Sequence, residues 1–206
     1  MGEFSDKTLA RVPPGFELGE PLRMLLEWIE FHHYVGTGHN GDLYGVLDGR
    51  HRGPGVVIQG FTSEHTAFYV KSWFGDVDDD PTRWLWPFAE TGADGSMAAL
   101  WIGDDGRSRV VHLGSGSGSL LTCVLAEDAL DFVRLLAIGY DELCRPEDFE
   151  AAPEEPQRTA LLREWVEQTF AVSVPRTASE IVRHPAEMGD EDTPDPFCRL
   201  VNRLIL

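Results

Sequence analysis

Length, composition and charge exclude several classes of protein. The chain has 206 residues, of which 42% are hydrophobic and 10% aromatic, so it is expected to bury a core and not to be disordered. Its 17 Lys and Arg against 35 Asp and Glu give a formal net charge of −18. Such a charge repels nucleic-acid phosphates and anionic lipid, which excludes both as expected partners, whereas a basic protein would be attracted. Solubility or a salt-adapted host would also account for the charge.

The cysteines and the apolar runs indicate the compartment. Cys123, Cys144 and Cys198 are widely spaced and form no CxxC pair. This odd count argues against a disulfide framework and a zinc ribbon, so we expect buried free thiols. The chain begins without a charged-then-apolar signal, and no apolar run approaches the ~20 residues of a membrane helix. We therefore expect a cytoplasmic protein that does not enter a membrane.

The first half of the chain is predicted to hold an arm, a helix and a series of strands. Residues 1–17 are polar and rich in proline and glycine, which is typical of a flexible arm. Apolar residues from Leu22 to Ile29 recur at helical spacing, and this helix is expected to end near Gly36. Runs rich in β-branched and aromatic residues then predict strands at residues 43–47, 56–59, 66–74, 97–102, 109–113 and 120–125.

The second half changes to helical spacing. Apolar residues from Ala129 to Leu143 predict a helix that Pro146 stops, and a further helix is expected over residues 158–171. Residues 147–157 are acidic and contain proline, which predicts a solvated linker. Short helices are expected over residues 178–183 and from Pro196, so residues 147–206 form a C-terminal helical extension.

This order of elements predicts the fold class. Closely spaced strands without intervening helices are typical of an antiparallel meander. We therefore expect an α+β protein with a single, mainly antiparallel (mixed) sheet of about six strands and helices packed against it. The whole of residues 1–206 is expected to form one domain.

Two glycine-rich segments resemble nucleotide-binding motifs only by letter. Residues 36–41 spell GxGxxG, but they follow a helix and precede a strand, so a flexible connector is favoured over a dinucleotide site. Residues 113–119 read LGSGSGS, without the lysine of a phosphate-binding loop or the serine of GxSxG, and are predicted to connect two strands.

Residues 76–80 form a cluster of carboxylates in a predicted loop. Carboxylate oxygens suit hard cations, but Pro81 and Pro87 occupy the positions where a calcium loop of the EF type needs Gly and Glu. A solvated face, a metal site or a partner-binding face therefore remain open, and a small hydrolase or metal-dependent enzyme that uses this cluster is one alternative. We predict no cofactor, no metal and no catalytic residue, and His112 is predicted to be a satisfied sheet residue and not a base.

Tryptophan and phenylalanine are dense just before and after this acidic loop, at residues 73–74 and 84–88. Large aromatic side chains dominate both cores and interface hot spots. Core packing is the favoured interpretation for most of them, and Trp84 is the candidate for an exposed interface anchor.

Several of these segments resemble one family. They are the Trp-Pro-Phe-Ala segment at residues 86–89, the glycine-rich turn at 91–96 with strand 97–101, the strand and turn at 110–115, the strand-to-helix segment at 125–143, and Asp-Pro-Phe at 195–197. Together they are similar to the SUKH superfamily, which includes the yeast cell-wall-assembly regulators and many bacterial immunity proteins. One departure is the turn itself, which reads Thr-Gly-Ala-Asp-Gly-Ser where many members have a Gly-Gly-Gly-Asp-like sequence.

The resemblance implies a non-enzymatic protein that neutralises a cognate bacterial toxin, often a nuclease. The charge agrees with it independently, because a nuclease must be basic to hold nucleic acid. The alternative is a regulatory or scaffold module that binds other proteins, as in the eukaryotic members. In either case we expect the interface in the acidic strip between residues 76 and 105, formed by Asp76, Asp78, Asp79, Asp80, Trp84, Asp94, Asp104 and Asp105.

Overall fold

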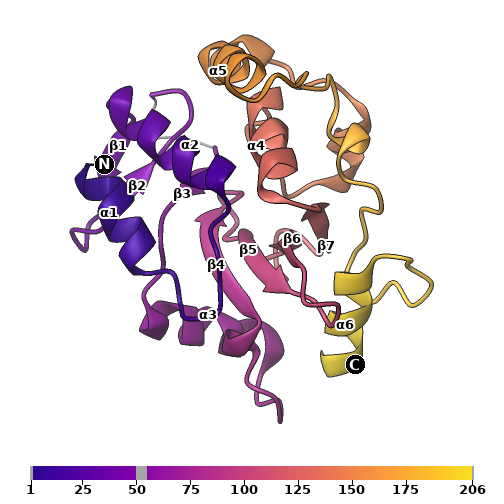
Figure 1. The fold of residues 1–206 in the computed structure, drawn as a ribbon. Coiled ribbons are helices and arrows are strands. Elements are labelled where there is room, and N and C mark those ends of the chain that lie inside the picture. The colour runs from indigo at the N-terminus through magenta and orange to yellow at the C-terminus, as the bar shows by residue number, and fades with distance from the viewer. Residues whose placement is uncertain (1, 50–54, 206) are drawn as a thin grey trace.

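A computed structural model describes residues 2–49 and 55–205, and it contains a seven-stranded antiparallel sheet whose strands are ordered β1 to β7 as in the sequence (Figure 1). The strands are β1 (Val35–Thr37), β2 (Leu43–Gly45), β3 (Val57–Ile58), β4 (Leu85–Glu90), β5 (Met97–Ile102), β6 (Ser108–Leu113) and β7 (Thr122–Ala126). The predicted α+β class and antiparallel sheet are confirmed, with one strand more than the six expected.

Helices from both ends of the chain surround this sheet. The α-helices of the described residues are α1 (Glu3–Ala10), α2 (Glu20–Phe31), α3 (Ser63–Phe74), α4 (Ala129–Ile138), α5 (Ala160–Phe170) and α6 (Pro196–Ile205). Short 3-10 turns are η1 (Pro81–Arg83), η2 (Pro146–Glu150), η3 (Pro156–Thr159) and η4 (Ala178–Glu180). None of the helices in residues 2–49 and 55–205 is both long and apolar enough to span a membrane.

Helices cover both faces of the central strands β4 to β7. Along β5, Ala98 and Leu100 join a core formed with α1, α2, α4 and α5, whereas Ala99 and Trp101 join a second core formed with α3 and α6. In Figure 1, α3 and α6 accordingly lie below the sheet, and α2 and α4 lie above it. Strands buried on two sides are apolar along their whole length and do not alternate, and every residue of β7 is buried.

The expectation of a flexible arm was wrong for residues 3–10, which form α1. Phe4 is only 1% exposed and belongs to the main core. The carboxylate of Glu30 on α2 accepts hydrogen bonds from the Phe4 backbone N–H at 2.8 Å and from Ser5 Oγ at 2.7 Å. The burial of Phe4, the packing of Leu9 against the same core, and hydrogen bonds to a carboxylate far away in the sequence hold this polar segment in place. No local sequence pattern indicates these contacts.

The strand predicted over residues 66–74 was also wrong, because this segment is the helix α3. Its buried residues are Thr66, Val70 and Phe74, which recur four residues apart and form one face of a helix. Thr62 caps the first turn, since its hydroxyl accepts a hydrogen bond from the His65 backbone N–H. The β-branched and aromatic composition of the segment had concealed this spacing.

The central strand β4 and the short strand β1 were not predicted. Pro87 lies within β4, where it cannot donate to the ladder, and the register with β5 shifts between Pro87 and Ala89. In β1, the ring of Tyr44 on β2 lies where a Cβ on Gly36 would be, so the ring packs directly on the backbone of the glycine. The GxGxxG segment is therefore the β1–β2 hairpin and precedes no helix, which excludes a dinucleotide-binding turn.

The helices predicted from about residues 129, 158 and 196 are confirmed as α4, α5 and α6, although α4 ends at Ile138 and does not reach Leu143. The short helix expected over residues 178–183 is only the 3-10 turn η4, and the glycine-rich residues 113–119 connect β6 to β7 as expected. Asp195 fixes the last helix. Its carboxylate accepts from the Cys198 N–H at 2.8 Å, which caps α6, and from the Val124 N–H of β7 at 2.9 Å. All three cysteines are buried free thiols, as predicted.

The buried position of α1 gives a direct test. Replacing Phe4→Ala removes a buried aromatic ring, so we expect a loss of about 3 kcal/mol in the free energy of unfolding, measured by urea denaturation. The matched change Phe31→Ala alters a ring that is 79% exposed and should cost less than about 0.5 kcal/mol. Equal, small effects of both changes would contradict the packing of α1.

Candidate protein-binding site

Most of the carboxylates predicted to form an interface lie at one end of the sheet. β4 begins there after the loop that holds residues 76–84, and the β5–β6 turn with Asp104 and Asp105 lies beside it. The Ile102 N–H at the end of β5 donates to the Trp84 carbonyl at 2.8 Å, which joins the two segments. The structure therefore brings together the residues on either side of this bond, which are separated by two strands in the sequence.

The side chains of the first segment are mostly engaged within the protein. Trp84 is half-buried and packs edge-on against Phe74, and its Nε1 donates to Asp79 at 3.2 Å. Asp80 caps η1 by accepting from the Thr82 N–H at 3.0 Å, and the exposed Asp76 pairs with Lys71 at 2.9 Å. Trp84 therefore joins the acidic loop to α3, and it is half-buried, whereas an exposed position was predicted.

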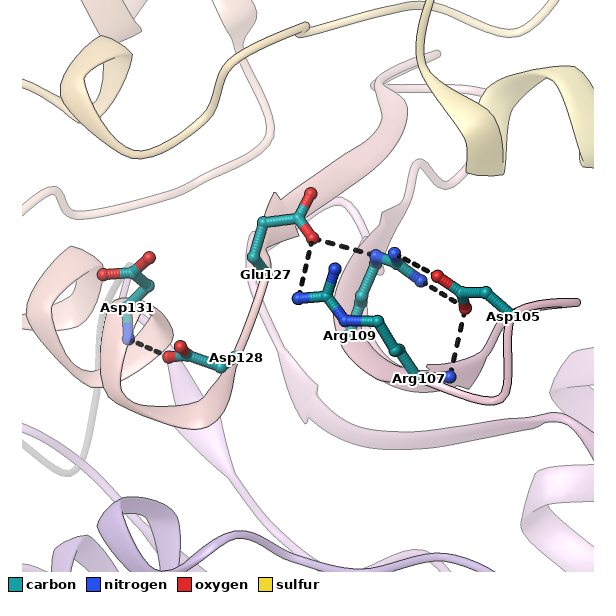
Figure 2. A network of polar contacts seen from close by, with 6 residues as sticks. All are labelled: Asp105, Arg107, Arg109, Glu127, Asp128 and Asp131. Carbon is teal, nitrogen blue, oxygen red and sulfur yellow. Dashed lines mark hydrogen bonds and ion pairs between the residues drawn. The ribbon is translucent and has the colours of Figure 1, made fainter.

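The second segment is organised by Arg109 (Figure 2). Its guanidinium donates to both carboxylate oxygens of Asp105, at 3.0 and 2.7 Å, and its Nε donates to Glu127 at 3.0 Å. The same guanidinium lies 5.7 Å from the ring centroid of Trp101. The Arg109 side chain is only 10% exposed, and its hydrogen bonds hold the pKa of Asp105 well below its usual range.

Basic side chains offset much of the acidic charge at this end of the sheet. A hollow of about 530 Å³ between the β5–β6 turn and α6 is lined by Asp104 and Asp105, but also by Arg109, Arg199 and Arg203. Arg199 and Arg203 are exposed and one helical turn apart on α6. A basic partner would meet these arginines together with the two carboxylates, so the acidic strip of the sequence is not a uniform acidic surface.

Asp94 does not lie with the other carboxylates of the predicted interface. It lies in the β4–β5 turn at the opposite end of the sheet, where it accepts hydrogen bonds from Ser96 N–H and Oγ and from Ser115 Oγ, at 2.8 to 3.0 Å. Burial alone would raise the pKa of Asp94, but these hydrogen bonds hold it below its ordinary value. Asp94 therefore ties the β4–β5 turn to the β6–β7 connection.

A second hollow, between the end of α4 and residues 145–155, is far more acidic. It encloses about 530 Å³. It is lined by Gly139, Tyr140, Asp141, Glu142, Arg145, Asp148, Ala151, Ala152, Pro153, Glu154 and Glu155. Five carboxylates thus face one arginine in a concave surface that would suit basic side chains.

Close packing, hydrogen bonds and a buried phenylalanine hold the walls of this acidic hollow. Gly139 ends α4 in the left-handed conformation, with φ of 100°, and a Cβ there would meet Thr159 Oγ1 at 2.5 Å. Tyr140 Oη donates to the Ala151 carbonyl at 2.6 Å and accepts from the Ala178 N–H at 3.0 Å. Phe149, only 1% exposed, anchors η2 in the core. Residues 147–157 were expected to form a solvated linker, but they are held in place and form one wall of the hollow.

One half-buried arginine offsets part of the charge beneath the hollow. Arg158 is 15% exposed and forms an ion pair with Asp48 at 2.9 Å, another with Asp141, and a longer one with Glu155 at 3.7 Å. Glu142 accepts from the Ala93 N–H at 2.9 Å. Asp148 and Glu154 are exposed on the wall, so the hollow keeps its negative character after these pairs are counted.

Sequence reasoning missed this hollow although one signal was present. The stretch Pro-Glu-Asp-Phe-Glu at residues 146–150 places a single aromatic residue in an acidic run. Such a residue can anchor a loop whose carboxylates then stay at the surface. Arg158, in contrast, pairs with Asp48, which is far away in the sequence, so no local pattern indicates this ion pair.

The buried polar groups elsewhere are structural. His112 is fully buried on β6, with Nδ1 donating to the Leu121 carbonyl at 2.8 Å and Nε2 hydrogen-bonded to Thr91 Oγ1 at 2.9 Å. Because the carbonyl can only accept, Nδ1 carries the proton of the neutral ring. The prediction of a satisfied sheet histidine is confirmed. Within residues 2–49 and 55–205, no group of His, Cys, Asp and Glu is arranged to hold a metal ion.

Comparisons of this chain with protein-family models, with curated proteins and with solved structures found no match.

The Arg109 network predicts unequal effects for two neighbouring arginines. Arg109→Met leaves Asp105 and Glu127 without their main donor, so we expect a loss of about 2 kcal/mol in unfolding free energy. The exposed Arg107 approaches Glu127 only to 3.7 Å, so Arg107→Met should change stability by less than about 0.5 kcal/mol. Denaturation of both variants measures the difference, and similar losses would show that Arg109 does not organise the turn.

His112 predicts a loss of stability in mild acid. Burial lowers the pKa of His112 to about 4, below its ordinary value of 6.5, so the unfolded chain binds more protons between these values. The histidine therefore stabilises the fold fully above about pH 6.5 and loses this contribution as pH falls towards 4. The stability gap between the natural chain and His112→Asn should shrink by about 2 kcal/mol from pH 7 to pH 5. A gap that is constant with pH would contradict the lowered pKa.

Proposed function

We propose that this chain is a SUKH-like immunity protein that binds a cognate, basic bacterial toxin and blocks its active or substrate-binding surface. The acidic hollow carries the proposal, because it is a concave surface in which five carboxylates outnumber one arginine. Lys or Arg side chains of a toxin would enter the hollow, where hydrogen bonds to its carboxylates would replace their hydrogen bonds to water. A toxin that cleaves nucleic acid needs such side chains to hold its substrate, so covering them would stop cleavage.

Three further observations support a binding function without catalysis. The formal net charge of −18 favours fast association with a basic protein. The buried His112 and the buried thiols are unsuited to react with a substrate, and burial raises the pKa of Cys144 and Cys198 to about 11. The segments at residues 86–143 and 195–197 resemble a family whose bacterial members are typically toxin inhibitors.

The test begins with capture of the partner from the native host in low salt, and continues with its rate of association measured by stopped flow. The double variant Asp148→Lys with Glu154→Lys reverses charge in the hollow. We expect it to slow association by about tenfold in low salt and far less in high salt. Asp78→Lys with Asp104→Lys is the matched control, because it makes the same charge change on exposed carboxylates at the sheet end.

Each alternative has a distinct result. A larger effect of the Asp78 and Asp104 changes would place the interface at the sheet end and contradict the hollow. A rate that does not depend on salt would contradict electrostatic recognition altogether. If the captured partner is harmless when produced without this chain, the immunity role fails, and the chain is a regulatory or scaffold module.

A further inference from the structure

A second concave surface, apolar and separate from the acidic hollow, lies between α2 and α5. It is a groove of about 550 Å³. Trp28 of α2 and Trp165 of α5 form its floor, with ring centroids 5.9 Å apart. α4 packs against both helices, so the groove is set on the rigid part of the fold. Its remaining lining residues are Met24, Glu27, Phe31, His32, Leu161, Glu164 and Gln168.

The walls of this groove expose large apolar side chains to water. Phe31 on α2 is 79% exposed and Leu161 on α5 is 53% exposed. They are two of the four large apolar side chains most exposed in residues 2–49 and 55–205; the others are Phe68 and Leu120. Two such side chains that converge on one groove, with Met24 and two indole rings below them, are typical of a surface that another molecule covers.

The charges at the rim indicate what kind of molecule this is. Glu27 lies on the α2 side and Glu164 on the α5 side, and Gln168 donates to Glu164 at 2.9 Å. His32 is the only basic side chain that lines the groove. Arg163 on α5 donates instead to the carbonyls of Val174 and Pro175, at 2.9 and 3.3 Å. An apolar floor between two acidic edges is complementary to an apolar stripe flanked by basic residues.

We propose that this groove binds one basic amphipathic helix of a partner protein. The apolar residues of such a helix, spaced at i, i+3, i+4 and i+7, would pack on Trp28, Trp165 and Phe31, and its Lys or Arg residues would meet the rim. A second copy of this chain is a poorer occupant, because each copy carries a net charge of −18. The inference rests on the proposed function in that the partner is basic, and it adds how that partner is held.

The probe is a synthetic helix of Leu and Lys, about four turns long, with all leucines on one face. We expect the intact chain to bind one copy, measured by titration calorimetry and by the change in the tryptophan fluorescence of the chain, to which Trp28 and Trp165 in the groove contribute. The double variant Phe31→Ser with Leu161→Ser should weaken binding by at least about tenfold. Phe68→Ser, a change at an apolar side chain that is 66% exposed on α3, should leave the affinity unchanged. A peptide of the same composition without an apolar face should bind more weakly.

Equal binding by the groove variant and the Phe68→Ser variant would overturn the groove, since charge alone would then explain the affinity. A dimer of the chain that sedimentation detects, and that Phe31→Ser with Leu161→Ser dissociates, would assign the groove to a second copy and overturn the proposal. Capture experiments separate this inference from the proposed function. A captured toxin that binds the groove variant normally overturns the groove alone. Groove-dependent binding of the Leu-Lys helix without any captured toxin overturns the proposed function alone.

Discussion

The structure depends on four central strands, β4 to β7, that helices cover on both faces. These strands of the antiparallel meander present an apolar surface on each side, and each surface must be covered by helices for the strands to remain folded. The chain meets this requirement with segments from both of its ends: α1 and α2 precede the sheet, and α6 follows all other elements. This explains why polar contacts of long sequence separation occur where the covering helices meet the sheet and each other. Asp195 joins α6 to β7, and Glu30 joins α2 to α1.

The same constraint decides what could be predicted from the sequence. Helices with one apolar face, such as α2 and α4, and hairpins marked by glycine were predictable because their signals are local. β4 was missed because a strand buried on both sides shows no alternation, and Pro87 argues locally against a strand. α3 was mistaken for a strand because its composition favours one, although Thr66, Val70 and Phe74 carry a helical period.

The candidate site was less predictable than the fold, because net charge does not locate a charged surface. The carboxylates of residues 76–105 are dense in the sequence, but folding sets Arg109, Arg199 and Arg203 beside Asp104 and Asp105. Folding also places Asp94 at the opposite end of the sheet, where its hydrogen bonds join the β4–β5 turn to the β6–β7 connection. The acidic hollow, in contrast, is lined by one stretch of the chain, residues 139–155, whose carboxylates are also dense in the sequence. Its shape depends on tertiary contacts: the hydrogen bond of Tyr140 with Ala178, the burial of Phe149, and the pairing of Arg158 with Asp48.

Both proposed binding surfaces adjoin the C-terminal part of the chain, which shares none of the strands. η3 follows the acidic hollow and leads directly into α5, so the wall residue Glu155 and the groove residue Leu161 lie on either side of this short turn. α5 is held on α4 by the buried Leu162 and Val166, which leaves its other face free to carry Leu161, Glu164 and Trp165. A partner that occupied both surfaces would therefore contact α5 together with the acidic wall that precedes it in the sequence, so its apolar and basic side chains would meet neighbouring parts of one region of the chain.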